Sequence, residues 1–286
     1  MKKNLEPHQL VERSLITKFR KPIWNQFILA VKRYELIQEG DKIAVCISGG
    51  KDSMLMAKLM QELQKHSDVP FDLVYLVMDP GYNEVNRAQI EKNAELLQIP
   101  IQIFESDIFD VANSTPKNPC YLCARMRRGY LYSRAQALGC NKIALGHHFN
   151  DVIETTVMGM FYGAQLQGML PKLHSTNFPG MTLIRPLYCV HEDDIIAWMR
   201  YNDLKFIQCA CRFTEAAAVE HGVSKRQEIK ELLRELKKVN PNVETSVFRS
   251  IHAVSLDTFV GYKTDGETHS FLERFNRMED GPADDE

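Results

Sequence analysis

The segment best suited to chemistry is a glycine-rich run that contains a lysine and an aspartate. It follows an apolar run at residues 42–47 and leads into a stretch with helical spacing. At such a junction, backbone N–H groups and the positive end of the helix point at an anion, and paired glycines let the backbone approach it. The run predicts a phosphate or nucleotide site. Its residues are Ser48, Gly49, Gly50, Lys51, Asp52 and Ser53.

The spacing excludes two other phosphate motifs. A Walker A loop needs a glycine where this chain has Val45, and a serine or threonine where it has Asp52. A dinucleotide fingerprint needs a third glycine that is absent here. An ordinary turn between a strand and a helix is the alternative to a phosphate site.

A second chemical feature is the pair Cys120 and Cys123, which leads into an arginine-rich segment with helical spacing. Two cysteines at this spacing can converge on one metal, and nearby arginines with a helix start lower thiol pKa values. Further ligands must come from a distant part of the chain, where Cys209 and Cys211 form the other cluster. Spacing alone favours zinc over an iron–sulfur cluster with three cysteine ligands or a redox pair.

The composition is that of an ordinary globular protein. Of 286 residues, 44% are hydrophobic and 25% are charged, and the formal net charge is -2. We expect a cytoplasmic protein without a membrane span, because no apolar run has the required length. Seven cysteines argue against a disulfide framework, and Cys46 and Cys189 fit a buried core. The net charge neither supports nor excludes a nucleic-acid partner.

Strand-like and helical runs alternate through the first half of the chain. Strands are expected at 42–48, 72–79, 99–106 and 142–148, with helices between them. This alternation predicts an α/β fold with a doubly wound, mostly parallel sheet. The predicted domains are an N-terminal helical segment at 1–40, an α/β domain at 41–215, and a helical extension with an acidic tail at 216–286.

Some local features can also be predicted. Pro22 is expected to separate two N-terminal helices. Beyond Thr155 the alternation fades: 185–190 and 206–209 are expected to be short strands or extended pieces, with a helix at 192–202 between them. Ser224 and Gln227 form a capping box for a helix that should stop near Asn240.

The loop at residues 48–53 resembles that of the PP-loop ATP pyrophosphatases. The resemblance implies that the loop grips the β- and γ-phosphates of ATP while a substrate oxygen attacks the α-phosphate. Lys51 and the loop amides would stabilise the charge on the departing pyrophosphate. Mg²⁺ is implied, with Asp52 as a contact. Met78 and Asp79 would lie beside the nucleoside.

A combination of motifs resembles the tRNA 2-thiocytidine synthetase (TtcA) family. They are the loop, the cysteine pair with its arginine-rich helix, residues 146–155 and residues 185–187, and the resemblance spans about 16–214. It implies a [4Fe-4S] cluster held by Cys120, Cys123 and either Cys209 or Cys211, of which we favour Cys209. Gly146, His147 and Asp151 would line the ATP site, with no proton-transfer role assigned to the histidines at 147 and 148.

Two departures from that family stand out. A single residue, Ala210, separates Cys209 from Cys211, where the family commonly has two, so the third ligand stays open between them. Asn150 stands where the family usually has the first of two aspartates, and Asp151 is the one retained.

The resemblance implies ATP-dependent thiolation of tRNA. ATP would adenylate O2 of an anticodon-loop cytidine, and sulfur supplied by a cysteine desulfurase would replace that oxygen. A homodimer is also implied. Phosphate contacts would come from the arginine-rich helix, Arg125, Arg127, Arg128 and Arg134, and from basic residues of the N-terminal helices, Lys18, Arg20, Lys21, Lys32 and Arg33, although such residues can equally form an ordinary solvated face.

Three alternatives remain. One is a PP-loop enzyme that thiolates or desulfurises another base or a small molecule. The second is a cluster-free PP-loop ligase or amidotransferase, which the cysteine pair opposes. The third is a zinc-stabilised nucleotide-binding module without chemistry, which the intact Lys51, Asp52 and Ser53 oppose.

Overall fold

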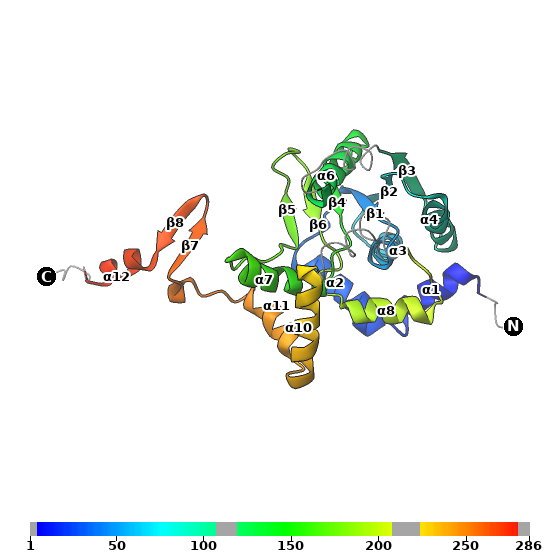
Figure 1. Ribbon diagram of the computed structural model, residues 1–286. Helices are drawn as coiled ribbons and strands as arrows, with labels where there is room; N and C mark the ends of the chain where they lie inside the picture. The colour runs from blue at the N-terminus through cyan, green and yellow to red at the C-terminus, as the bar shows by residue number, and fades with distance from the viewer. Residues whose placement is uncertain (1–4, 107–118, 208–223, 280–286) are drawn as a thin grey trace.

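The computed structural model describes residues 5–106, 119–207 and 224–279, without the side chains of 119–124 and 277–279. Its centre is a six-stranded sheet in the order β3-β2-β1-β4-β6-β5 (Figure 1). Only β5 runs antiparallel to its neighbour, so the predicted α/β architecture is confirmed. The strands are β1 (Lys42–Ile47), β2 (Asp72–Asp79), β3 (Ile101–Glu105), β4 (Lys142–Ala144), β5 (Lys172–His174) and β6 (Thr182–Ile184).

Alternate side chains of β1 point to opposite faces of the sheet, and both faces are buried. Ile43, Val45 and Ile47 join a cluster covered by α3 (Lys51–His66), α4 (Glu84–Leu96) and α8 (Glu192–Tyr201). Ala44 and Cys46 join the cluster under α6 (Pro119–Ala137). A central parallel strand is covered in this way because helical crossovers occupy both faces. The helices in these described ranges lack the length and hydrophobicity of a bilayer-spanning segment.

The strand order creates a crevice beside β1. The chain moves from β1 outward to β2 and β3, then returns to place β4 on the other side of β1. The loops that follow β1 and β4 therefore diverge at the carboxyl ends of these two strands. Open α/β sheets bind their ligands at such a point.

Two N-terminal helices, α1 (Pro7–Ile16) and α2 (Asn25–Arg33), are joined through a π-helical turn, η1 (Arg20–Trp24). The predicted break at Pro22 is wrong. Pro22 lies inside η1, where the carbonyl of Phe19 accepts hydrogen bonds from the N–H groups of Ile23 and Trp24. Its missing N–H is tolerated because it falls in the first turn of the continuous η1–α2 unit. The helix interruption lies instead at Thr17, the C-cap of α1.

The predicted strand at 185–190 is a pair of tight turns. The N–H of Tyr188 bonds to the carbonyl of Arg185, and that of Val190 bonds to the carbonyl of Leu187. Pro186 has no N–H to give to a ladder, which disfavours a central strand there. The sheet is completed by β5 and β6 instead. Residues 206–207 are irregular, and 208–209 lie outside the described residues.

The C-terminal extension begins with α10 (Lys225–Val239) and α11 (Val243–Ser250), which pack against α7 (Phe149–Gly163). Ser224 caps α10 as predicted, accepting a hydrogen bond from the N–H of Gln227. The Gln227 side chain donates to Glu231 and does not accept from the N–H of Ser224 in the described structure, so only half of the expected box forms. The helix ends at Asn240 as predicted.

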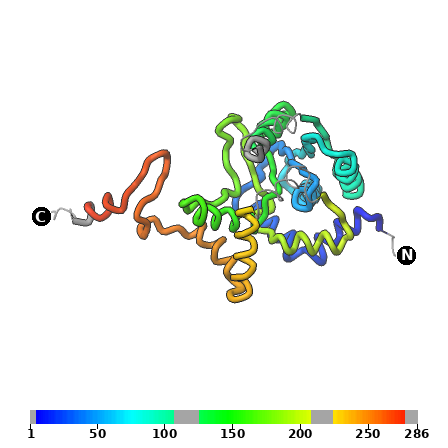
Figure 2. Tube along the Cα trace, viewed as in Figure 1, coloured from blue at the N-terminus to red at the C-terminus, as the bar shows by residue number. Residues whose placement is uncertain are grey.

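Beyond α11 the chain forms an arm, residues 254–279, that extends away from the sheet (Figures 1 and 2). It contains η2 (Leu256–Thr258), β7 (Gly261–Thr264), β8 (Glu267–Ser270) and α12 (Phe271–Glu279). Helices and a tail were expected here, and the hairpin was not predicted. The turn residues Asp265 and Gly266 both have positive φ, and an Asp-Gly pair is a known signal for a two-residue hairpin. The acidic residues 280–286 lie outside the described residues.

Candidate functional site

A cavity of about 320 Å³ opens at the carboxyl ends of β1, β2 and β4. It lies at the crevice that the strand order creates, and it joins the glycine-rich loop to α6. The cavity therefore places the glycine-rich loop beside α6, the helix in which the cysteine pair lies. It is lined by Cys46, Ile47, Ser48, Asp52, Ser53, Met78, Arg127, Leu131, Leu145, Gly146, His147 and Asp151.

Two glycines give the loop its shape. Gly49 has φ +84°, and a Cβ there would lie 2.6 Å from Ile90 and 2.7 Å from Ile207. A Cβ on Gly146 would lie 3.1 Å from the backbone nitrogen of Ser53. Glycine at 146 thus lets the end of β4 approach the first turn of α3, which closes the cavity floor.

Ser53 ties the loop together. Its hydroxyl accepts a hydrogen bond from the N–H of Ser48 at 3.1 Å and donates to the carbonyl of Gly50 at 3.0 Å. The loop is thus fixed at both ends of its turn before any ligand binds, and the cost of ordering it on binding is small.

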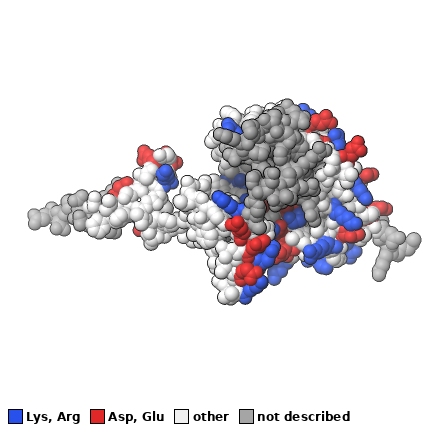
Figure 3. Space-filling view, in the orientation of Figure 1, with Lys and Arg blue, Asp and Glu red and all other residues white. Residues whose placement is uncertain are grey.

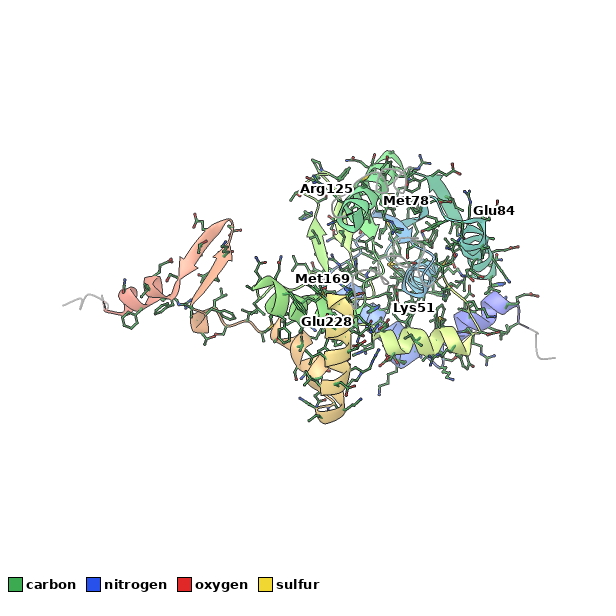
Figure 4. The ribbon with its side chains drawn as sticks, in the orientation of Figure 1. Lys51, Met78, Glu84, Arg125, Met169 and Glu228 are labelled. Atoms are coloured by element: carbon green, nitrogen blue, oxygen red, sulfur yellow. The ribbon has the colours of Figure 1, made fainter. Side chains whose placement is uncertain are left out.

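Lys51 and Asp52 take different directions at the start of α3. Asp52 lines the cavity, and its buried Oδ1 has no hydrogen-bond partner in the described structure. Lys51, labelled in Figure 4, pairs with Asp52 and with Glu192 of α8, each at 3.1 Å. Burial alone would lower the pKa of Lys51, but these two carboxylates raise it, so the ammonium stays charged. Glu192 was not predicted from the sequence.

The histidine pair divides between two roles. His148 is the N-cap of α7: its ring accepts from the N–H of Asp151, whose carboxylate accepts from the N–H of His148. His147 lines the cavity, and its buried Nδ1 has no partner among the described residues. Burial, with a contribution from Arg185, lowers the pKa of His147 to about 4, so the ring is neutral near pH 7.

Asp151 connects the cavity to the C-terminal extension. Arg226 of α10 donates to its carboxylate at 2.7 Å and also faces Glu154 at 3.6 Å. Burial would raise the pKa of Asp151, but His148 and Arg226 outweigh it and lower the pKa. Arg226 was missed because nothing in its sequence neighbourhood distinguishes it from the other basic residues of an exposed helix.

The two residues expected beside the nucleoside, Met78 and Asp79, have different surroundings. Met78, labelled in Figure 4 at the end of β2, lines the cavity. Asp79 accepts hydrogen bonds from the N–H groups of Gly81 and Tyr82 and pairs with Arg87 at 3.2 Å. It shapes its own turn and is not among the cavity-lining residues.

Of the two cysteine-bearing segments, the structure describes α6, and this helix reaches the cavity. Cys120 and Cys123 lie in the first turns of α6, and Arg127 of the same helix lines the cavity and hydrogen-bonds to Tyr82. Their side chains are not described, and Cys209 and Cys211 lie outside the described residues. Ile207, the last described residue before them, lies against Gly49.

The cavity residues fit a magnesium nucleotide. Two carboxylates, Asp52 and Asp151, face one space, and Mg²⁺ commonly takes one or two carboxylates with phosphate oxygens and water. Asp52 Oδ1, which His148 Nε2 faces at 3.8 Å, and His147 Nδ1 make no hydrogen bond in the described structure, and a ligand would satisfy them. In the described part of the chain, no group of three His, Cys, Asp or Glu side chains could hold a metal alone.

Comparison with known proteins agrees with this geometry. Residues 18–212 match the PP-loop domain family. The chain is 36% identical over 226 residues to the tRNA-cytidine(32) 2-sulfurtransferase of Geobacter metallireducens, covering 78% of this chain and 85% of that protein. It is 37% identical over 233 residues to the enzyme of the same name from Vibrio parahaemolyticus serotype O3:K6, covering 79% and 75%.

One solved structure shares the fold. The U34-tRNA thiolase NcsA from Methanococcus maripaludis, determined with its [4Fe-4S] cluster, superimposes with a TM-score of 0.63 at 22% identity, covering 82% of this chain and 80% of NcsA. By sequence and by fold, this chain belongs to the PP-loop tRNA sulfurtransferases, in the family of the tRNA-cytidine(32) 2-sulfurtransferases.

Proposed function

We propose that this protein uses ATP to replace the O2 oxygen of cytidine 32 in the tRNA anticodon loop with sulfur, giving 2-thiocytidine. The observation that carries the proposal is the cavity that the phosphate loop shares with α6. Ser48, Asp52 and Ser53 line one side of it, and Arg127, one turn beyond Cys123, lines the other. A nucleotide held by the loop therefore lies next to the helix that bears the cysteine pair.

The first chemical step is activation of the base. O2 of the cytidine attacks the α-phosphate of ATP, and pyrophosphate leaves. The loop amides at residues 48–53 and Lys51 stabilise the charge that accumulates on the pyrophosphate. Asp52 and Asp151 would hold Mg²⁺, which would neutralise part of the charge of the triphosphate. His147 is neutral near pH 7 and so lines the pocket without adding charge.

The second step replaces oxygen by sulfur. A bond forms between sulfur and C2 while the C2–O2 bond breaks, and AMP departs with the oxygen. Cys120, Cys123 and Cys209, or Cys211 in place of Cys209, are the proposed ligands of a [4Fe-4S] cluster, whose fourth iron would be open to carry sulfur. The donor set fits, because three thiolates leave one iron without a protein ligand. A cysteine desulfurase would supply the sulfur as a persulfide, and a thiol reductant would give the two electrons that bring it to the sulfide level before transfer.

The tRNA contacts combine local basic surfaces. The cytidine leaves its stack to reach the cavity, as bases do for other modifying enzymes. Arg125 and Arg128 on α6 and Lys32 and Arg33 on α2 are candidates for phosphate contacts. Lys18 is partly engaged elsewhere, since its ammonium lies 3.9 Å from the centre of the Tyr201 ring. We place the protein in the cytoplasm, where its tRNA substrate and a reducing environment coincide.

The arm supports a homodimer. A two-stranded hairpin is marginal on its own, and Phe271, Leu272 and Phe275 of α12 are exposed, as are Met160, Phe161 and Leu170 beyond and within α7. Residues 254–286 contain nine Asp or Glu against three Lys or Arg, whereas residues 1–253 contain 32 Lys or Arg against 28 Asp or Glu. This charge difference favours docking of the arm on a second copy of the chain.

The dimer is tested by light scattering at micromolar concentration. The full chain should be dimeric, and Phe271→Ser with Phe275→Ser should make it monomeric. The control Val85→Ser, which changes a single exposed residue of α4, should leave the dimer intact. A monomeric wild-type protein would refute this part of the proposal.

The function is tested by nucleoside analysis of tRNA from a strain that lacks the gene. We expect 2-thiocytidine to be absent, to return with the wild-type gene, and to stay absent with Lys51→Ala. If 2-thiocytidine persists and another thiolated nucleoside is lost, the substrate is another base. If no thiolated nucleoside is lost, a cluster-free ligase or a binding module is the better description.

A further inference from the structure

The lysine of the phosphate loop is already paired before any phosphate arrives. Lys51 Nζ lies 3.1 Å from Asp52 Oδ2 and 3.1 Å from Glu192 Oε1, and its side chain is 22% exposed. Glu192 belongs to α8, 141 residues further along the chain. A triphosphate that uses this ammonium must therefore compete with two carboxylates.

Glu192 is itself held in place by neighbouring elements. Its second oxygen, Oε2, accepts from Lys230 of α10 at 2.5 Å, and its side chain is only 13% exposed. Its backbone N–H donates to Oδ1 of Asn150 at 2.9 Å. Glu192 thus bridges two lysines, one in the phosphate loop and one in the C-terminal extension.

These contacts explain why an asparagine suits position 150. Its Oδ1 accepts from Glu192 and its Nδ2 donates to Oε1 of Glu244 at 3.3 Å, while Lys237 pairs with the other oxygen of Glu244 at 2.6 Å. An aspartate at this position would lose the donor and add a third carboxylate near Glu192 and Glu244. The amide therefore suits the ion-pair network that joins α7, α8, α10 and α11. Figure 3 shows acidic and basic side chains intermixed over the lower part of the molecule, where α8 and α10 lie.

The same network borders a second cavity of about 390 Å³, distinct from the one at the loop. Glu192, Lys230 and Asn150 face it, together with Glu154 and Glu244. Its charged groups are largely paired with one another, so it offers no free set of ligands to a small molecule. The residues that line this cavity instead belong to the ion-pair network through which α10 contacts Glu192.

We propose that Glu192 is a positioning residue that holds Lys51 away from the nucleotide, and that Lys230 weakens this hold by sharing the Glu192 carboxylate. The C-terminal helix α10 thereby sets the affinity of the phosphate loop for ATP. This inference rests on the ATP-binding half of the proposed function and does not depend on the identity of the tRNA.

The electrostatics predict opposite effects for the two partners. Glu192→Gln removes a negative charge near the triphosphate and leaves Asp52 as the one carboxylate paired with Lys51 in the described structure, so ATP should bind about three- to tenfold more tightly. Lys230→Gln leaves the Glu192 charge unshared, so Lys51 is held more firmly and ATP should bind about three- to tenfold more weakly. Both effects should shrink in high salt, because screening weakens partly exposed ion pairs.

A double variant tests whether Lys230 acts through Glu192. If it does, Glu192→Gln with Lys230→Gln should bind ATP as Glu192→Gln alone does, which is a non-additive double-mutant cycle. Lys238→Gln is the matched control: Lys238 lies on the same helix and pairs with Glu235, outside the contacts that hold Glu192. It should leave ATP affinity within about twofold of the wild type.

The experiment is equilibrium binding of a non-hydrolysable ATP analogue to the full chain, with Mg²⁺ and again with EDTA, alongside a melting curve for each variant. Tighter binding by Glu192→Gln and weaker binding by Lys230→Gln support the inference, since damage to the fold cannot tighten binding. Weaker binding by both variants overturns it. The inference is also overturned if Glu192→Gln lowers the affinity for the ATP analogue with Mg²⁺ but not with EDTA, because Glu192 would then be a metal ligand. If the wild type binds no nucleotide, the proposed function fails as well.

Discussion

Ile207 lies directly against Gly49, so the segment that leads to Cys209 starts at the phosphate loop. Gly49 combines φ +84° with a Cβ position that would come within 2.6–2.8 Å of Ile90 and Ile207. Gly49→Ala should therefore destabilise the protein by about 1–3 kcal/mol and abolish high-affinity ATP binding, because backbone strain and overpacking act together. Melting curves and ATP-analogue binding check this.

The matched control for that variant is Gly129→Ala. Gly129 lies within α6, and a Cβ there meets nothing within 4 Å. Alanine favours a helix over glycine by up to about 1 kcal/mol, so the variant should be neutral or slightly more stable. If Gly49→Ala changed stability and ATP binding no more than Gly129→Ala does, the loop would tolerate a side chain at Gly49, which would contradict the prediction.

A buried ion pair attaches α1 to the α/β core. Lys58 of α3 is fully buried, pairs with Glu12 of α1 at 2.5 Å and donates to the carbonyl of Leu97. Lys58→Met should cost about 3–5 kcal/mol in the free energy of unfolding, since it leaves Glu12 and Glu62 without their buried partner. Lys65→Met, at a 45% exposed lysine on the same carboxylates, should cost less than about 1 kcal/mol. Urea unfolding distinguishes the two, and similar costs would contradict the assignment.

Glu154 should make stability depend on pH. Its carboxyl is buried, and burial raises its pKa to about 7 despite Arg226. Because the folded pKa lies above the ordinary 4.5, the folded state keeps a proton that the unfolded state releases between pH 4.5 and 7. This stabilisation is complete below pH 4.5 and is lost as the pH rises through 7.

Glu154→Gln should remove that dependence. Relative to the wild type, the variant should gain up to about 2 kcal/mol in unfolding free energy between pH 5 and pH 8. Denaturant curves in EDTA at both pH values measure it. A difference between the two proteins that does not change with pH would show that Glu154 titrates normally.

The parallel core of the fold could be predicted from the sequence because its strands are short apolar runs with both faces buried. β1, β2, β3 and β4 all fall within the predicted runs. Segment 185–190 has a similar composition, but it forms turns because Pro186 lacks an N–H and the neighbouring N–H groups bond locally. The last two strands of the sheet, β5 and β6, come instead from less apolar residues. Contacts between distant parts of the chain determine where these strands form, and the local composition gives no information about such contacts.

The candidate site was predictable only in part. The loop at 48–53, Met78, Gly146, His147 and Asp151 were predicted from motifs, and the cavity contains Ser48, Asp52, Ser53 and those four. Glu192 and Arg226 were not predicted, because their roles come from contacts over 141 and 75 residues of chain. Asp79 was predicted as a nucleoside contact, and this stays a prediction; its carboxylate accepts hydrogen bonds from the N–H groups of Gly81 and Tyr82 and from the side chain of Arg87.

The central claim is that an iron–sulfur cluster and an ATP site share one cavity. The most direct measurement is the iron and sulfide content of anaerobically purified protein, with its visible absorbance. We predict brown wild-type protein with about four iron and four sulfide per chain. The colour should be lost in Cys120→Ala and Cys123→Ala, and in one of Cys209→Ala and Cys211→Ala, and retained in Cys140→Ala, a buried cysteine of the core. Colourless wild-type protein with stoichiometric zinc would contradict the account.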